Sequence, residues 1–157
     1  MPQIETPTVE VNDLMPAAEE LSAPGSDAGA GQPRQRCVLL AEDDRSVRRY
    51  LEVILQRAGY RVITAADGLE AMKLALSSEV DAMIADSIMP HLSGQELCRL
   101  LRSNPKVSSL PMVLLTALEN KDRVSAHGVQ FDACLYKPVN VEELTECLAR
   151  LLESRRV

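Results

Sequence analysis

The spacing of hydrophobic residues changes along this chain. From residue 37 onward, short apolar runs of strand length alternate with segments in which apolar residues recur every three or four positions. The runs that predict strands are 37–41, 60–65, 82–85, 112–116 and 131–136. The segments between and after them predict five helices, of which the one at 118–127 has the fewest strong apolar residues. This alternation predicts an α/β domain whose five-stranded parallel sheet is covered on both faces.

Polar residues mark where several of these helices begin or end. Asp44 is the predicted N-cap of a helix starting near Arg45, and Gly59 suits the C-terminal end of that helix. Ser93 and Asn140 each stand three residues before a glutamate, which is typical of a helix start, and the Ser93 pattern predicts a capping box. The last helix is expected to reach about residue 155.

Residues 1–36 have a different composition from the rest of the chain. They contain five of the nine prolines, three of the seven glycines, six acidic residues and two basic residues. Such a segment buries too little apolar surface to offset the entropy lost on ordering. The sequence therefore predicts a disordered acidic tail at 1–36 and one domain at 37–157.

Composition and charge exclude several classes of function. With 17 basic and 23 acidic residues the net charge is −6, which disfavours nonspecific binding to DNA. No apolar run approaches the roughly 18 residues of a membrane helix, and the N-terminus lacks the features of a secretory signal. The four cysteines contain no CxxC pair, and the two histidines add no zinc spacing. We therefore expect a cytoplasmic protein with reduced thiols.

Polar residues follow four of the five predicted strands. The residues are Glu42, Asp43 and Asp44 after the first strand, Asp86 after the third, Thr116 at the end of the fourth and Lys137 after the fifth. Parallel strands joined by right-handed crossovers end at one edge of the sheet, and open α/β sheets bind ligands at that edge. We therefore expect these side chains to lie close together.

This set of side chains suits phosphoryl transfer. Two carboxylates about 4 Å apart repel by about 4 kcal/mol at an effective dielectric constant near 20, and one lysine cannot offset three of them. A Mg²⁺ ion can offset this repulsion, because it binds to a few carboxylates and keeps several water ligands. A carboxylate beside Mg²⁺ and an ammonium group can accept a phosphoryl group. Each residue alone would more often be a helix cap or a solvated group. Because they occur together at the ends of strands in one sheet, a shared catalytic site is the better interpretation.

Four segments carry a family resemblance that covers residues 37 to about 154. "VLLAEDD", "DSIMPHLSG", "VLLTA" and "KP" occur in this order. Together they resemble the motifs of response regulator receiver domains of two-component systems. The resemblance implies a flavodoxin-like, doubly wound (βα)5 fold with a five-stranded parallel sheet.

The resemblance also implies a role for each matched residue. Asp86 would accept a phosphoryl group from a phosphohistidine. Glu42 and Asp43, with Asp86 and the backbone carbonyl of Ile88, would hold Mg²⁺. Thr116 would hydrogen-bond a phosphoryl oxygen, Lys137 would pair with its charge, and the bond from Lys137 to Pro138 would be cis. The three consecutive acids leave the register of the metal-binding pair open, and we take Glu42 and Asp43 because they directly follow the apolar run.

The chain departs from the family at one position. The aromatic residue that the family usually has three positions before the lysine is Cys134 here, and Tyr136 does not match that position. A cysteine cannot swing a ring between a buried and an exposed position. We therefore expect the signal to pass through the loop after Thr116 and the weak helix at 118–127. Ile88 and Leu118 are expected to hinder the water that removes the phosphoryl group.

The expected function is that of a stand-alone phosphoacceptor switch, not an enzyme beyond its own phosphorylation and dephosphorylation. The donor would be a sensor histidine kinase or a histidine phosphotransfer protein. The face made by 118–127, the strand at 131–136 and the last helix would control an output protein or pair two copies of the chain. Three alternatives remain: a phosphorelay intermediate that passes phosphate to a histidine phosphotransfer protein, a Mg²⁺-dependent phosphatase, and an unphosphorylated adaptor. Ile88 disfavours the phosphatase, which usually has an acid/base aspartate at that position.

Overall fold

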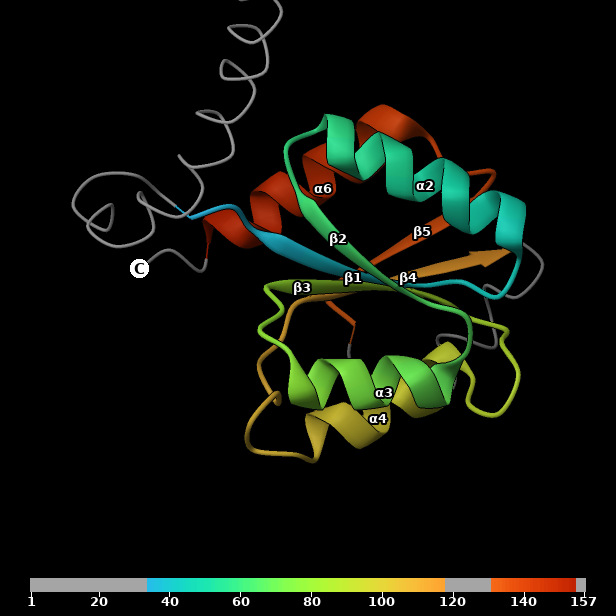
Figure 1. Cartoon of the computed structure of the whole chain (residues 1–157), viewed down its shortest axis with the longest axis vertical. Coiled ribbons are helices and arrows are strands. Elements are labelled where there is room, and N and C mark those ends of the chain that lie inside the picture. Colours follow the sequence, from blue (N-terminus) through green and yellow to red (C-terminus); the bar gives the residue numbers. More distant parts are fainter. Residues whose placement is uncertain (1–33, 118–130, 155–157) are drawn as a thin grey trace, which may run out of the picture. The chain divides into compact units, whose positions relative to one another are not determined.

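A five-stranded, entirely parallel sheet forms the centre of the domain (Figure 1). The computed structural model describes residues 34–117 and 131–154. The strands are β1 (Cys37–Ala41), β2 (Arg61–Ala65), β3 (Ala82–Asp86), β4 (Met112–Ala117) and β5 (Ala133–Lys137), in the spatial order β2-β1-β3-β4-β5. This order belongs to the flavodoxin-like doubly wound folds, and it confirms the predicted architecture.

Helices cover both faces of the sheet, as Figure 1 shows. Helices α2 (Arg45–Arg57) and α6 (Val141–Glu153) lie on one face, and α3 (Gly68–Ser77) and α4 (Gly94–Arg102) lie on the other. Alternate residues of β1 enter the two cores: Val38 and Leu40 pack with α2 and α6, whereas Leu39 and Ala41 pack with α3 and α4. Because both faces of this strand are buried, its sequence is a continuous apolar run rather than an alternating one.

The helix boundaries follow the predicted caps. The Asp44 side chain accepts a hydrogen bond from the Val47 amide at the start of α2, and Asn140 does the same for Glu143 at the start of α6. The Ser93 capping box at the start of α4 is complete. Gly59, just after α2, has a φ of +101°, a conformation that a glycine adopts without strain.

Several strand limits differ from the predicted ones by one or two residues. Strand β2 begins at Arg61 because the Tyr60 amide still donates to Leu55 at the end of α2. Strand β5 begins at Ala133, after Asp132, whose carboxylate accepts a 2.7 Å hydrogen bond from the Met112 amide. Helix α6 ends at Glu153 rather than near residue 155.

Two predicted segments cannot be compared with the structure. The tail at 1–36 lies almost entirely outside the described residues, and so does the helix at 118–127. Within residues 34–117 and 131–154, four helices are present, and none is long and apolar enough to cross a membrane.

Candidate functional site

The polar residues at the strand ends meet at one edge of the sheet. Asp86 ends β3, Thr116 lies near the end of β4 and Lys137 ends β5, while Glu42 directly follows β1. Strand β3 pairs with β1 on one side and with β4 on the other, so the register brings these ends together. Glu42, Asp86 and Thr116 are buried, with exposed fractions of 1%, 5% and 0%.

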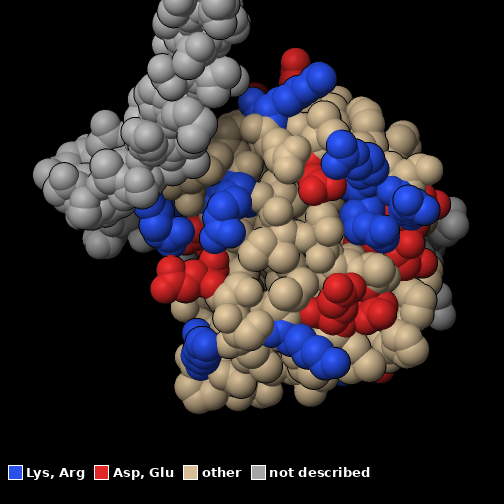
Figure 2. Space-filling view, viewed as in Figure 1, with Lys and Arg blue, Asp and Glu red and all other residues tan. Residues whose placement is uncertain are grey.

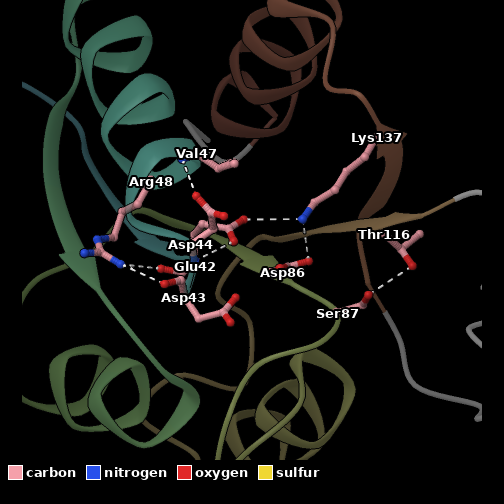
Figure 3. Close-up of polar contacts among 9 residues, drawn as sticks. All are labelled: Glu42, Asp43, Asp44, Val47, Arg48, Asp86, Ser87, Thr116 and Lys137. Atoms are coloured by element: carbon pink, nitrogen blue, oxygen red, sulfur yellow. Dashed lines mark hydrogen bonds and ion pairs between the residues drawn. The ribbon is translucent and has the colours of Figure 1, made fainter.

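Lys137 joins the two buried carboxylates. Its Nζ lies 3.0 Å from Oδ1 of Asp86 and 3.5 Å from Oε1 of Glu42. In Figure 3 the lysine side chain points between the two acids. The bond between Lys137 and Pro138 is cis, as predicted. One half-buried ammonium group therefore pairs with two buried acids.

The turn after β1 is held by its own hydrogen bonds. The Asp44 amide donates to Oε2 of Glu42 at 3.1 Å, and the Arg48 guanidinium donates to the Glu42 carbonyl at 2.8 Å (Figure 3). Because Asp44 caps α2, its carboxylate is turned to the helix. Asp43, in contrast, shares a cluster with Glu42 and Asp86 in which one oxygen of each lies within 4.8 Å of the others. Arg48 is a positioning residue that the sequence analysis did not identify.

Burial and charge shift the proton affinities of this cluster. Burial raises the pKa of Glu42 to about 7, and the nearby Asp86 carboxylate adds to the effect, although the Asp44 amide and Lys137 oppose it. Burial lowers the pKa of Lys137, but its contacts with Asp86 and Glu42 outweigh burial and raise it. The lysine therefore stays charged, while Glu42 resists ionisation.

The cluster has the donor set of a hard divalent cation. Oε1 of Glu42 is buried and has no hydrogen-bond partner among the described residues, since Lys137 lies 3.5 Å away. A buried carboxylate oxygen left in this way costs free energy unless a further positive group approaches it. The three clustered carboxylates are ligands of the kind that Mg²⁺ prefers. The residues present therefore fit the expected metal.

Thr116 contacts Ser87, a residue for which the sequence predicted no role. Oγ of Ser87 donates to Oγ1 of Thr116 at 3.0 Å, and both side chains are buried. Figure 3 shows these two hydroxyl groups pointing toward each other. One sequence feature could have indicated a role for Ser87: it is a polar residue that directly follows Asp86, at the end of a buried strand and before two apolar residues.

The structure places Cys134 and Tyr136 next to β4. Cys134 lies opposite Leu114 and Tyr136 lies opposite Thr116 in the parallel register. Both side chains are half-buried, and burial raises the pKa of the Cys134 thiol. An aromatic residue therefore neighbours Thr116 in the sheet, although not at the family's usual position. Ile88 is 62% exposed, and Leu118 lies outside the described residues.

Gly94 sets the spacing between α4 and the end of β3. A Cβ at this position would lie 2.5 Å from the Asp86 carbonyl oxygen and 2.7 Å from Cδ1 of Leu114. We expect Gly94→Ala to lower the free energy of unfolding by about 2 kcal/mol, because backbone must shift to relieve the contact. Urea denaturation measures this change.

Gly59→Ala is the matched control for Gly94→Ala. A Cβ at Gly59 meets nothing within 4 Å, so its cost comes from the positive φ alone and should be about 1 kcal/mol. If Gly94→Ala costs no more than Gly59→Ala, then Gly94 does not set this spacing.

Curated relatives share the sequence of this domain. The chain is 38% identical over 121 residues to the response regulator MprA of Mycobacterium ulcerans, an alignment that covers 76% of this chain and 51% of the relative. It is 40% identical over 116 residues to MprA of Mycobacterium avium, covering 73% and 50%. The chain thus spans about half the length of the curated relatives it matches, and its stand-alone character stays a prediction.

Solved structures share the fold. The receiver domain of a signal transduction histidine kinase from Syntrophus aciditrophicus has a TM-score of 0.72 at 30% identity, covering 77% of this chain and 92% of that one. The receiver domain of a sensor histidine kinase from Pseudomonas aeruginosa has a TM-score of 0.71 at 30% identity, covering 76% and 99%. That structure has a magnesium ion coordinated in its active site cleft.

The family assignment follows from the sequence of the whole domain. The family model of the response regulator receiver domain matches residues 38–149, which include all the strand-end residues described above. Fold, site geometry and sequence relatives agree with this match. The chain therefore belongs to the response regulator receiver domain family of two-component systems.

Proposed function

We propose that this domain is a phosphoacceptor switch in which Asp86 receives the phosphoryl group. The observation that carries the proposal is the position of Asp86, a buried carboxylate 3.0 Å from Lys137 and within the acidic cluster of Glu42 and Asp43. A buried carboxylate beside an ammonium group can act as a nucleophile toward an anionic phosphoryl group, because positive charge is already present.

The transfer itself needs one bond made and one bond broken. An oxygen of Asp86 attacks the phosphorus of a phosphohistidine, the P–N bond breaks, and the imidazole leaves with its electron pair and takes up a proton. Lys137, which pairs with Asp86 before transfer, then neutralises charge on the phosphoryl oxygens. The hydroxyl group of Thr116 would donate a hydrogen bond to one of those phosphoryl oxygens.

Glu42, Asp43 and Asp86 are the side chains that would hold Mg²⁺, together with the backbone carbonyl of Ile88. The bound ion would supply charge stabilisation to the transferred phosphoryl group. The proposal is supported by the acidic cluster and by Oε1 of Glu42, which is buried and has no hydrogen-bond partner among the described residues. The magnesium ion of the P. aeruginosa relative supports it further.

The surface near the site suits an anionic donor. Figure 2 shows basic side chains, with acidic ones among them, over α2, and the first turns of this helix, next to the site, contain Arg45, Arg48 and Arg49. The donor would be a sensor histidine kinase or a histidine phosphotransfer protein in the cytoplasm. An output protein, or a second copy of the chain, would read the phosphorylated state on the face that includes β5 and α6.

The domain would catalyse only its own phosphorylation and dephosphorylation. Turnover of external substrates needs a second acid/base group beside the nucleophile, and the residue two positions after Asp86 is the exposed, apolar Ile88. Passing the phosphoryl group on to a histidine phosphotransfer protein would use the same site.

Intact mass spectrometry after incubation with acetyl phosphate tests the proposal. We expect one phosphoryl group to be gained with Mg²⁺ and none with EDTA. The adduct should be lost on treatment with hydroxylamine, which cleaves acyl phosphates but not phosphoserine or phosphothreonine. The proposal fails if no adduct forms with Mg²⁺, or if the adduct survives hydroxylamine.

A further inference from the structure

The hydroxyl group of Ser87 lies where it can hold Thr116. We propose that Ser87 is a positioning residue that retains the Thr116 hydroxyl in a resting position, away from the phosphoryl site, and so opposes the activated state. The proposal rests on the proposed function, since it concerns the regulation of that same site.

The backbone of Ser87 is fixed by two neighbouring elements. Its amide donates to the Leu115 carbonyl of β4 at 2.8 Å, and its carbonyl accepts from the Gly94 amide of α4 at 3.0 Å. Strand and helix therefore hold the serine on both sides. Its hydroxyl group has a defined place beside β4, where Thr116 is the next residue after Leu115.

The two hydroxyl groups depend on each other. Oγ of Ser87 donates to Oγ1 of Thr116 at 3.0 Å, and the exposed fractions of the two residues are 4% and 0%. The other contact of Thr116 Oγ1, with the Ala117 carbonyl, is long at 3.4 Å and therefore weak. Within 34–117 and 131–154, the only hydrogen bond found for the Ser87 hydroxyl group is the one to Thr116.

This dependence favours the resting position. If Thr116 turned its hydroxyl group to a phosphoryl oxygen on Asp86, the Ser87 hydroxyl would lose its acceptor inside the protein. Leaving a buried donor unsatisfied is costly, whereas an alanine at the same place would lose nothing. With alanine, the Thr116 hydroxyl would keep only its weak contact with the Ala117 carbonyl at rest, and it would gain a stronger acceptor in the phosphorylated state. Ser87 thus lowers the stability of the activated state relative to the resting one.

Beryllofluoride, which mimics a phosphoryl group on a carboxylate, provides the test. In the presence of Mg²⁺ we expect the full chain with Ser87→Ala to bind beryllofluoride about five-fold more tightly than the unchanged chain, the factor that one net hydrogen bond supplies. Ser87→Cys, with a similar volume and a weaker donor, should lie between the two. In a Thr116→Val background, Ser87→Ala should change the affinity by less than two-fold.

A second measurement is independent of phosphoryl chemistry. Three-bond NMR couplings to the Thr116 methyl group, without beryllofluoride, should report one side-chain rotamer in the unchanged chain and averaging over rotamers in Ser87→Ala. A merely structural role of Ser87 would leave the rotamer unchanged. If Ser87→Ala fails to fold, the beryllofluoride affinity and the Thr116 couplings are compared between Ser87→Cys and the unchanged chain instead.

The outcomes separate this proposal from the proposed function. Equal or weaker beryllofluoride binding by Ser87→Ala, or the same gain with Thr116→Val, overturns the role of Ser87. If the unchanged chain binds no beryllofluoride, the proposed function fails. In that case the NMR couplings alone decide whether Ser87 holds Thr116. An unchanged Thr116 rotamer in Ser87→Ala would then refute the proposed role of Ser87.

Discussion

Asp86→Asn is expected to abolish the gain of a phosphoryl group from acetyl phosphate in Mg²⁺. An amide oxygen is a far weaker nucleophile than a carboxylate, so the rate of labelling should fall below detection. The fold should survive, because the substitution preserves shape and removes one negative charge from a crowded acidic cluster. Intact mass spectrometry follows the labelling, and circular dichroism confirms that the variant is folded.

Asp44→Asn is the matched control for this experiment. Asp44 lies in the same acidic turn, but its carboxylate accepts from the Val47 amide at the start of α2. Asparagine is an equally good N-cap, so the helix should be unaffected and labelling should continue at the normal rate. Labelling that persists in Asp86→Asn, or disappears in Asp44→Asn, would place the phosphoacceptor elsewhere in the chain.

The contribution of Glu42 to the free energy of unfolding of the metal-free protein is expected to fall as pH rises from about 4.5 to 7. Burial raises the pKa of Glu42 from 4.5 to about 7 in the folded protein, so the folded state binds this proton more tightly than the unfolded chain does. The stabilisation is therefore complete below pH 4.5 and is lost as pH rises through 7, a change of about 3 kcal/mol.

Glu42→Gln isolates this contribution. Glutamine does not titrate, so the free energy of unfolding of the unchanged chain minus that of Glu42→Gln should fall across this pH range in EDTA. Urea denaturation at several pH values measures the difference. Glu146→Gln, an exposed position on α6, should follow the unchanged chain. Parallel pH profiles for the unchanged chain and Glu42→Gln would show that Glu42 is not responsible.

Magnesium should reverse the loss of stability in the unchanged chain. At pH above 7 the ionised carboxylates are free to bind the ion, and a ligand that binds only the folded state raises the free energy of unfolding. The rise should be smaller in Glu42→Gln, because one carboxylate ligand is missing. The same denaturation series, repeated with Mg²⁺, measures both changes.

The sequence by itself determined the parallel sheet, and it predicted the ends of all five strands to within two residues. Buried parallel strands must be apolar on both faces, so runs such as 37–41 are distinct from the helices around them. Helix starts were equally readable, because Ser93 and Asn140 bond to amides only three residues away. The closeness of Asp86 and Lys137 could also be predicted, since parallel strands end at one edge.

Only the tertiary structure decided how the site residues divide their contacts. Whether Asp43 or Asp44 joins the acidic cluster depends on which carboxylate turns to the first amides of α2. The pairing of Ser87 with Thr116 joins residues 29 positions apart. No local pattern encodes it, because it depends on the register of β3 against β4 and on the rotamers of two buried side chains. The position of Tyr136 opposite Thr116 has the same origin, since register is a property of the assembled sheet.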